Sequence, residues 1–259
     1  MQSVSLGRTR LFVYEDGAAL TGGLAETLVE LSAACVSERG RFALALSGGS
    51  TPKALYRLLA EDRFSKRMPW ASTHLFWGDE RCVDPDHPDS NFKMVDDALI
   101  KSVPIPSTNV HGFTGQGDDP ARAAAAYEEG LRAFFALNGD DLPQFDLILL
   151  GLGPDGHTAS LFPGTTALLE RRRLVVPVYV DRLATWRVTL TLPVLNNGRH
   201  VAFMVAGADK QPMVTRVLSG EGPPLPAQLI DPAGTLSWYL DRAAAAGLAE
   251  LEPAAEGRA

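Results

Sequence analysis

A glycine-rich turn that carries a carboxylate and an imidazole is the part of the chain best suited to chemistry. The turn follows the apolar run Leu147–Leu150, which predicts a buried strand, and it contains Asp155 and His157 two residues apart. In open α/β sheets ligands bind just outside the carboxyl ends of the strands. A carboxylate and an imidazole at such a place indicate general acid/base chemistry. The turn is also expected to deliver His157 to the start of a helix.

Two opposed effects act on the charge state of His157. A single histidine is more often structural than catalytic, but this one lies beside Asp155 in a glycine-rich turn. The positive end of a helix would disfavour the imidazolium form, whereas Asp155 would favour it. The balance predicts a neutral base that can become an acid near pH 7.

The same turn has the spacing of a dinucleotide-binding fingerprint. Gly151, Gly153 and Gly156 follow the predicted strand, and Asp181 lies where an acid that binds the ribose would be expected. Against this interpretation, Asp155 lies inside the turn and would repel a pyrophosphate at short range. We therefore rank a nucleotide site well below an acid/base site.

A second motif is a loop of glycines and hydroxyl groups that follows the apolar run Phe42–Leu46. Its members are Ser47, Gly48, Gly49, Ser50 and Thr51. Pro52 then suits the first position of a helix. Glycines let a backbone approach an anion closely, and free amides and hydroxyls at a helix start donate hydrogen bonds to it. The loop predicts a phosphate site, with a tight turn and a Ser or Thr helix cap as the alternative.

Basic residues lie at the ends of other strand-like runs. Arg81 follows one run and is a candidate to clamp either an oxyanion or a phosphate, and the sequence does not choose between them. Arg187 and Lys210 adjoin two later runs and, with the Ser47–Thr51 loop, would supply the positive field that a phosphate needs. Residues expected to support the site are Asp79, Glu80 and Asn91.

These motifs need a scaffold that brings several strand ends together, and the hydrophobic pattern predicts one. Strands are predicted at Leu11–Tyr14, Phe42–Leu46, His74–Trp77, Asp146–Leu150, Leu174–Val180, Val188–Leu192 and Val201–Val205. Helices are predicted at Ala18–Glu38, Pro52–Ala60, Asn91–Ile100 and Pro120–Leu137. Several strands are almost continuously apolar, as expected when both faces are covered. The alternation predicts an α/β fold with a doubly wound, mostly parallel sheet and helices on both faces.

Length and composition narrow the class of protein. The chain has 259 residues, is 46% apolar and carries a formal net charge of −7, which argues against a general nucleic-acid binder. Its two cysteines make neither a disulfide framework nor a zinc cluster. We expect Cys35 to be buried, and Cys82 to be a bystander or a neighbour of the site. The first ten residues lack a signal-peptide core, and no uninterrupted apolar run approaches membrane-spanning length, so we expect a cytoplasmic protein with no membrane partner.

One domain over residues 1–259 is the simplest organisation. The segment Val103–Asp119, rich in Pro, Gly and Asp, is predicted to be a loop, and its charge pattern requires no domain boundary. The tail after Ala243, rich in Ala, Glu and Gly, is expected to form a short terminal helix that frays.

Together the motifs resemble the family that comprises glucosamine-6-phosphate isomerases and 6-phosphogluconolactonases. The matching segments are Leu46–Pro52, Trp77–Arg81 with Ser90 and Asn91, Gly151–Pro163, Arg187–Thr191 and Gly207–Lys210. In the isomerases a Glu that assists opening of the sugar ring precedes the proline, and this chain has Phe162 there. The isomerases also tend to have Tyr where this chain has Arg81. Both departures favour the lactonase branch.

The resemblance implies a Rossmann-like fold and hydrolysis of 6-phospho-D-glucono-1,5-lactone to 6-phospho-D-gluconate without a metal or organic cofactor. His157 would take a proton from water and return it to the ring oxygen, with Asp155 orienting or stabilising it. Arg81 would serve the oxyanion or the phosphate, and the Ser47–Thr51 loop, Arg187 and Lys210 would anchor the phosphate. The alternatives are an aldose–ketose isomerase and a non-catalytic phosphosugar sensor. The oligomeric state, monomer or homodimer, stays open.

Overall fold

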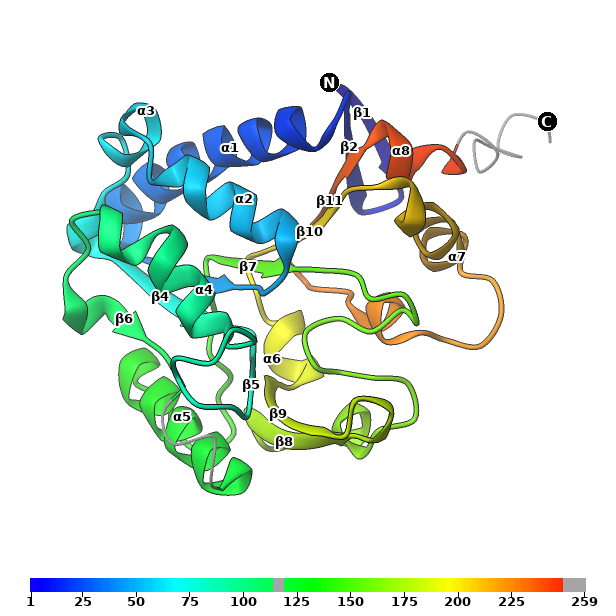
Figure 1. Ribbon diagram of the computed structural model, residues 1–259. Coiled ribbons are helices and arrows are strands. Elements are labelled where there is room, and N and C mark those ends of the chain that lie inside the picture. Colours follow the sequence, from blue (N-terminus) through cyan, green and yellow to red (C-terminus); the bar gives the residue numbers. More distant parts are fainter. Residues whose placement is uncertain (114–118, 249–259) are drawn as a thin grey trace.

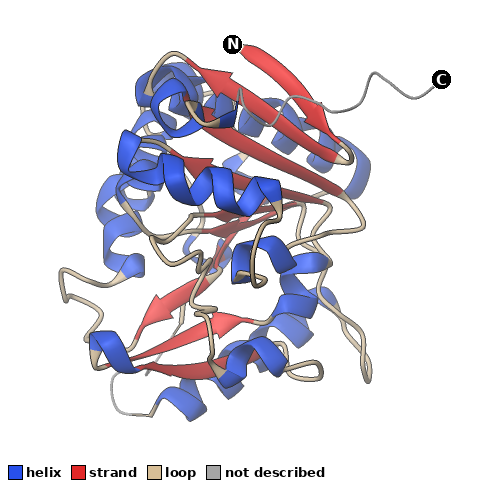
Figure 2. Cartoon of the chain, turned by 90° about the vertical axis from the view of Figure 1, so that its right-hand side faces the viewer, coloured by secondary structure: helices blue, strands red, loops and turns tan. Residues whose placement is uncertain are grey.

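The computed structural model describes residues 1–113 and 119–248 of the chain (Figure 1). Within these residues the strands form a larger sheet of eight strands and a smaller sheet of three. Figure 2 shows the smaller sheet below the larger one and helices on both sides of the larger one. In spatial order, the larger sheet consists of β1 (Gln2–Leu6), β2 (Thr9–Tyr14), β11 (Thr235–Asp241), β10 (His200–Val205), β7 (Leu147–Leu150), β3 (Phe42–Leu46), β4 (Thr73–Trp77) and β6 (Val110–His111).

The larger sheet reverses its direction of winding between β3 and β7. Its neighbouring strands are parallel except for β1 and β2, which form an antiparallel pair. From β3 the chain proceeds outward through β4 to β6, whereas from β7 it proceeds the other way through β10 to β11. A sheet wound in this way leaves a crevice at the carboxyl ends of the strands that flank the reversal. The predicted doubly wound, mostly parallel sheet is confirmed.

Helices cover the larger sheet and keep its central strands out of water. The helices are α1 (Gly17–Arg39), α2 (Ser50–Leu59), α3 (Asp62–Ser65), α4 (Asn91–Ala98), α5 (Pro120–Phe135), α6 (Leu192–Asn196), α7 (Gln211–Ser219) and α8 (Arg242–Ala245). Because helices lie on both faces, β3 and β7 are buried at every position. This double burial explains why their sequences are continuously apolar rather than alternating.

The long helix α1 packs against β2, β3 and β11. By length and composition alone it is apolar enough to cross a membrane. Its side chains at Leu20, Leu24 and Leu28 are fully buried, as expected of a helix that covers a sheet. Glu26 and Glu30 interrupt its apolar sequence.

The smaller sheet is a separate antiparallel unit that the sequence did not indicate. Its order is β5 (Asp79–Arg81), β9 (Thr185–Leu190) and β8 (Val175–Val180), and α5 packs against β8 and β9. The run predicted as a strand at Val188–Leu192 therefore begins earlier and ends earlier, because Leu192 starts α6. A short strand after β4 and a hairpin from a distant part of the chain meet here, close to the crevice.

The remaining predictions have mixed outcomes. The six other predicted strands and the four predicted helices are present, with ends that differ by a few residues. The strands β1, β5, β6 and β11 and the helices α3, α6 and α7 were not predicted. The predicted loop Val103–Asp119 is wrong in part because it contains β6, and its residues 114–118 lie outside the described part. The predicted terminal helix begins with α8, while residues 249–259 also lie outside it. A single domain stays a prediction.

Candidate active site

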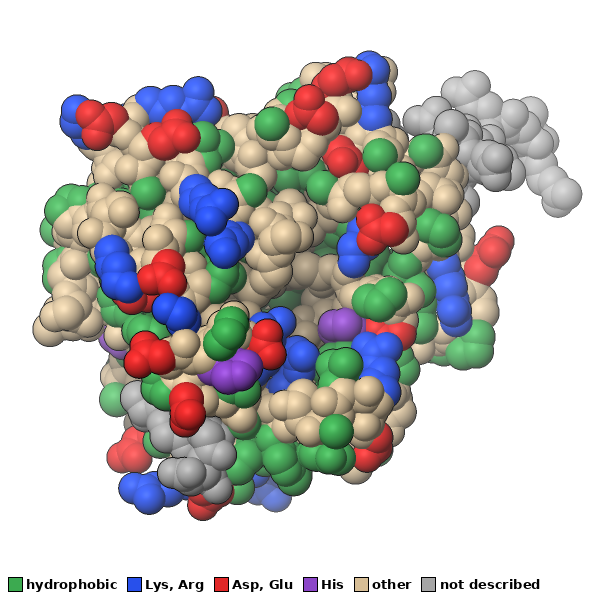
Figure 3. All heavy atoms as spheres, in the orientation of Figure 1, with side chains coloured by type: hydrophobic (Ala, Val, Ile, Leu, Met, Phe, Trp, Pro, Cys, Tyr) green, Lys and Arg blue, Asp and Glu red, His purple; other side chains and the backbone are tan. Residues whose placement is uncertain are grey.

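A cavity of about 250 Å³ lies at the carboxyl ends of four adjacent parallel strands, β10, β7, β3 and β4. Figure 3 shows the hollow near the middle of this face, with Lys or Arg side chains along its lower edge. Its lining consists of Ser47, Gly48, Gly49, Asp79, Arg81, Asn91, Gly151, Leu152, Gly153, Pro154, His157, Ala159, Arg187 and Lys210. Residues from every motif singled out in the sequence therefore meet in one place.

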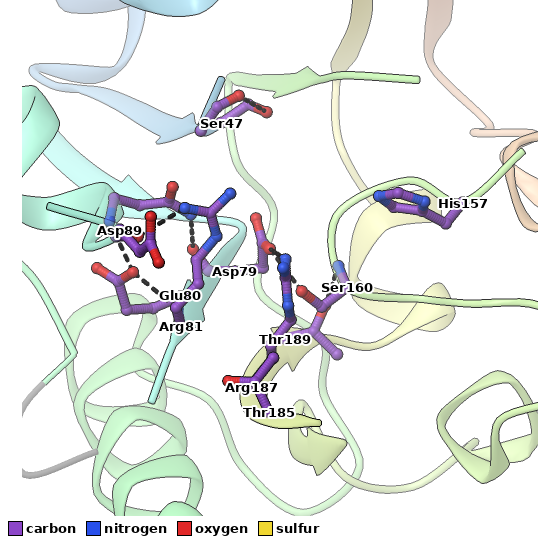
Figure 4. Close-up of polar contacts among 12 residues, drawn as sticks. Ser47, Asp79, Glu80, Arg81, Asp89, His157, Ser160, Thr185, Arg187 and Thr189 are labelled. Atoms are coloured by element: carbon purple, nitrogen blue, oxygen red, sulfur yellow. Dashed lines mark hydrogen bonds and ion pairs between the residues drawn. The ribbon is translucent and has the colours of Figure 1, made fainter. Parts of the chain in front are cut away.

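His157 is held by a carboxylate on one ring nitrogen and by an aromatic ring beneath it. Its Nδ1 contacts Oδ1 of Asp155, and its imidazole stacks on Phe162 with ring centroids 4.1 Å apart. In Figure 4 the ring points toward the side of the cavity where Ser47, Asp79 and Arg187 lie. If Nδ1–H donates to Asp155, Nε2 is left as the acceptor, which is the arrangement of a general base.

Burial and charge act in opposite directions on His157. Burial is the largest effect and lowers its pKa, whereas Asp155 and the more distant Asp79 raise it. The net result is a pKa below the ordinary value for histidine. For Asp155, burial favours a raised pKa, but hydrogen bonds from His157 and its charge outweigh this and lower the pKa. The pair therefore favours an ionised Asp155 beside a neutral His157.

Gly153 makes room for the imidazole. A Cβ atom built on Gly153 would lie 1.9 Å from Nδ1 of His157. No side chain can occupy that space while the ring keeps its position. In the pattern of Gly151, Gly153 and Gly156, Gly153 thus makes room for the side chain of His157 rather than for a pyrophosphate.

The prediction that His157 lies at a helix start is wrong. The chain from Gly151 to Thr165 contains turns and a single bridge between Thr158 and Leu161, and the next helical turn begins at Thr166. Gly156 has a φ of 78° and Ala159 a φ of 48°, both outside the right-handed helical region. A dinucleotide fingerprint requires a helix directly after the glycines, so this turn does not have the geometry of one. His157 therefore does not lie at the N-terminus of a described helix.

The serine–glycine loop leads from β3 into α2, but only part of it faces the cavity. Ser47, Gly48 and Gly49 line the cavity, whereas Ser50 and Thr51 form the first turn of α2 outside the lining. The helix begins two residues before Pro52, at Ser50, so the predicted start at Pro52 is wrong. Gly49 is the N-cap, and no described side chain accepts a hydrogen bond there, so the alternative of a Ser or Thr cap is also wrong.

Two contacts fix the position of this loop. The buried hydroxyl of Tyr56 accepts a hydrogen bond from the Ser47 amide at 3.0 Å and donates one to the Ser47 carbonyl at 2.8 Å. A Cβ on Gly48 would lie 2.0 Å from Oδ1 of Asn91, so only glycine permits that approach. The side-chain amide of Asn91 in turn donates to the backbone carbonyl of Asp79 at 3.0 Å. The loops after β3 and β4 are thereby joined.

Arg81 and Arg187 lie side by side on adjacent strands of the smaller sheet. They are paired residues of β5 and β9, and like charges placed directly opposite destabilise a sheet. The buried Nε atoms of both side chains have no hydrogen-bond partner within the described residues. The nearest carboxylate oxygen to Arg187 is Oδ2 of Asp79, at 4.0 Å, and that oxygen already accepts a hydrogen bond from Ser160 at 2.6 Å. The arrangement is suited to receive an anion.

Glu80, predicted as a supporting residue, serves the scaffold. Its buried carboxylate accepts hydrogen bonds of 2.7 Å from the amides of Arg81, Asn91 and Phe92. It thus satisfies amides at the start of α4, while burial, the largest effect, raises its pKa. Asp79 and Asn91, the other two predicted supporting residues, do line the cavity.

Lys210 reaches the cavity from the segment that follows β10. It ends a short helical turn, Ala208–Lys210, that follows β10. Its Nζ donates to the carbonyl of Leu152 at 3.1 Å, which brings the ammonium group to the turn that carries His157. Cys82 is not part of the lining, and burial raises the pKa of its thiol to about 12, so it is a bystander.

Several residues that build the site were missed by sequence reasoning. Ser160 lies inside a motif that was recognised, and Phe162 was singled out there only as a departure from the isomerases. The burial of both could have been inferred from that motif. The hydroxyl of Tyr127 fixes the end of β4 through hydrogen bonds with the backbone of Trp77, as Tyr56 does at the end of β3. Arg182 contacts Asp155 from a distant hairpin, with 2.9 Å between Nη2 and Oδ2. No local pattern around Tyr127 or Arg182 indicates these contacts.

Cavity size alone does not identify this site. A larger hollow of about 550 Å³ lies beside α7 and the edge of the sheet, lined by residues such as Val217, Leu229 and Trp238. Among the described residues that line it, Asp231 is the one titratable group, and it pairs with Arg8 at 2.8 Å. Among the described residues, no three His, Cys, Asp or Glu side chains gather as a metal site.

Comparisons with known proteins extend over the whole of this site. The model of the family described as "Glucosamine-6-phosphate isomerases/6-phosphogluconolactonase" matches residues 15–238. A 6-phosphogluconolactonase of Nostoc sp. is 42% identical over 238 residues, covering 91% of this chain and 97% of the relative. One of Synechocystis sp. is 44% identical over 233 residues, covering 86% and 95%. The solved structure of 6-phosphogluconolactonase from Trypanosoma brucei is 30% identical with a TM-score of 0.83, covering 94% of this chain and 100% of that one.

Proposed function

The chain belongs to the glucosamine-6-phosphate isomerase/6-phosphogluconolactonase family, and on this premise we propose that it hydrolyses 6-phospho-D-glucono-1,5-lactone to 6-phospho-D-gluconate. The reaction is the second step of the oxidative pentose phosphate pathway, and we place the enzyme in the cytoplasm. The observation that carries the proposal is the neutral His157, held by Asp155 at the edge of a cavity lined by three cationic side chains. No metal or organic cofactor enters the proposed reaction.

The first step is activation of water by His157. Nε2 accepts a proton from a water molecule as its oxygen attacks the lactone carbonyl, and Asp155 stabilises the imidazolium that forms. As the tetrahedral intermediate collapses, the bond to the ring oxygen breaks and the imidazolium returns the proton to that oxygen. A carboxylic acid and an alcohol result, and the acid ionises. General acid/base help of this kind contributes about 10²–10⁴-fold to the rate.

Arg81 and Arg187 are assigned to different negative charges of the reaction, the phosphate and the oxyanion. Arg187 shares Phe162 with His157, since its guanidinium lies 5.5 Å from the centroid of that ring. We therefore assign the oxyanion of the tetrahedral intermediate to Arg187, where its buried charge is most effective. Arg81, its partner on the neighbouring strand, donates to the carbonyl of Asp89 at 2.6 Å. It is assigned to the phosphate.

The phosphate is held by amides as well as by cations. The backbone of Ser47, Gly48 and Gly49 lines the cavity at the start of α2, where amides without helical partners are available. Lys210 adds a positive charge beside the catalytic turn. The side chains of Ser50 and Thr51 lie outside the lining, so these two residues would contribute through their backbone amides, the first two of α2. Anchoring the phosphate fixes the distance between the carbonyl and His157, which is a large part of catalysis by positioning.

An isomerase is the second candidate, and Phe162 argues against it. An aldose–ketose isomerase needs a further carboxylate that assists opening of the sugar ring, and the corresponding position holds a phenyl ring 3% exposed. The ring of Phe162 stacks on the imidazole of His157. Ammonia release from glucosamine 6-phosphate would favour this candidate over the lactonase. Binding of phosphosugars without turnover would favour a sensor.

A coupled assay tests the proposed function. Fresh lactone is generated by glucose-6-phosphate dehydrogenase, and its hydrolysis is followed by 6-phosphogluconate dehydrogenase at mildly acidic pH, where spontaneous opening is slower. We expect hydrolysis far above the spontaneous rate, in proportion to the protein added. Hydrolysis no faster than in buffer would contradict the proposal. For the division of roles, Arg187→Lys should chiefly lower kcat and Arg81→Lys should chiefly raise KM.

A further inference from the structure

A hairpin turn that no motif predicted brings a cation to the far side of Asp155. The turn between β8 and β9 consists of Asp181–Leu183 and ends at Ala184, which has a φ of 47°. It carries Arg182, whose Nη2 lies 2.9 Å from Oδ2 of Asp155. The two oxygens of this carboxylate are therefore divided, with Oδ1 on His157 and Oδ2 on Arg182.

The contact is more than an isolated surface ion pair. Nη2 of Arg182 also lies 3.5 Å from Nδ1 of His157, and its guanidinium lies 5.1 Å from the centroid of Phe162. Arg182 thus touches the acid and the base and lies against the ring on which the base stacks. The same hairpin carries Arg187 into the cavity, so its placement also affects the proposed oxyanion site.

Resting on the proposed function, we propose that Arg182 is a positioning residue for the lactonase reaction: it fixes Asp155 and shares its negative charge, which keeps His157 in the neutral form that accepts a proton. With Asp155 free of Arg182, its full charge would act on the imidazole and hold the proton more tightly. The base would then be protonated over a wider range of pH. The cation acts through Asp155 and needs no contact with substrate.

The other charges around His157 set the background for this effect. Burial is the strongest influence and lowers its pKa, Asp155 and Asp79 raise it, and Arg182 lowers it. The remaining charged side chains that line the cavity are Arg81, Arg187 and Lys210. Arg182 is the cation in direct contact with the carboxylate that orients the base. Its side chain is 46% exposed, so solvent screens the effect and the expected shift is moderate.

Two other roles for Arg182 predict different behaviour. A contact with the substrate phosphate would change KM and leave the pH dependence of kcat/KM in place. A purely structural role in the hairpin would lower the amount of folded enzyme, again without a change in that pH dependence. The pH profile therefore separates positioning from both.

The test compares the acid limb of kcat/KM for the wild-type enzyme, Arg182→Gln and Arg182→Lys. We expect Arg182→Gln to move the limb upward by about 0.2–0.7 of a pH unit, and Arg182→Lys to restore most of the wild-type position. Arg63→Gln, at an exposed position away from the cavity, is the matched control and should change nothing. An unchanged limb in Arg182→Gln would overturn the proposal, whatever happens to KM.

A second readout does not depend on activity. The Cε1–H resonance of His157, identified by its loss in His157→Gln, can be titrated by NMR in the folded protein. It should titrate at higher pH in Arg182→Gln than in the wild type by the same margin, and an identical titration would overturn the proposal. Failure of the proposed function would instead leave the wild type without lactonase activity while this titration could still show the shift.

Discussion

His157 and His111 have similar aromatic neighbours and different chemical settings. His157 stacks on Phe162 with centroids 4.1 Å apart, and His111 stacks on Phe76 at 4.3 Å. Burial is the largest cause that lowers the pKa of each, in the case of His111 to about 4. Nδ1 of His157 contacts the carboxylate of Asp155. Nε2 of His111, in contrast, lies 3.2 Å from Nδ1 of His74.

On the proposed mechanism, this difference is what would make a desolvated histidine act as a base. Burial against an aromatic ring makes both imidazoles neutral, so neutrality alone does not distinguish them. Asp155 gives His157 a fixed orientation and a partner that stabilises the protonated form, and the cavity gives it room for water and substrate. His111, on the edge strand β6, has a second histidine that opposes its protonation. The predictions below remove these differences in turn, from the largest expected effect to the smallest.

Loss of the carboxylate should make the two histidines alike. In Asp155→Asn the amide cannot stabilise the imidazolium, and we expect kcat to fall by about 10²-fold or more, measured in the coupled lactone assay. Asp181→Asn, at an exposed aspartate of the neighbouring turn, is the control and should retain wild-type kcat. A value of kcat for Asp155→Asn above half that of the wild type would show that the carboxylate is not needed.

Protonation should affect His111 through stability rather than activity. Its folded pKa of about 4 lies below the ordinary value of 6.5, so the unfolded chain binds more protons. Its contribution is complete above pH 6.5 and is lost as the pH falls through 6.5 toward 4. Between pH 7 and pH 4.5, urea unfolding of His111→Phe should lose roughly 2 kcal/mol less stability than the wild type. An equal loss in both proteins would show that His111 is not the titrating group.

A methyl group beside His157 should disturb the base without removing it. Gly153→Ala would place Cβ 1.9 Å from Nδ1, so the imidazole has to move away from its position over Phe162. We expect kcat/KM to fall by about 10-fold or more, because small misplacements of a catalytic group are costly. Gly130→Ala is the matched control: it lies in α5 with no atom within 4 Å of the added Cβ. Equal activity in the two variants would contradict the account.

The smallest effect concerns a cation at the cavity rather than the base. Lys210→Ala should raise KM by roughly 10-fold, the value of one charged hydrogen bond, and leave kcat nearly unchanged. Lys66→Ala, which removes an exposed lysine paired with Asp62, is the control. A fall in kcat with KM unchanged would move Lys210 from the phosphate to the reacting carbonyl.

The sequence was sufficient to group residues that line one cavity, because their motifs lie at the ends of apolar runs. Strands β10, β7, β3 and β4 are neighbours in one parallel sheet, so loops that follow them meet at one edge. Ser47, Arg81, His157 and Lys210 could therefore be grouped before any contact was known. Their roles as base, oxyanion contact and phosphate contacts remain proposals.

Other features depend on information that no local pattern contains. The left-handed conformation of Ala159 prevents a helix after His157, and alanine carries no signal for it. The smaller sheet joins β5 to a hairpin about a hundred residues later, and its strands resemble any others in composition. Arg182 meets Asp155 only because that hairpin reaches the turn that carries Asp155 and His157. Pairing over long sequence separations is decided by tertiary packing, which periodicity does not encode.

The central claim is that His157, and no other histidine of similar burial, activates water. Its most direct test is kcat/KM of His157→Gln beside His111→Gln in the coupled assay, corrected for spontaneous hydrolysis and for folded protein. The account predicts a loss of about 10²–10⁴-fold for His157→Gln and activity within about twofold of wild type for His111→Gln. Near-normal turnover by His157→Gln, or an equal loss in both variants, would contradict it.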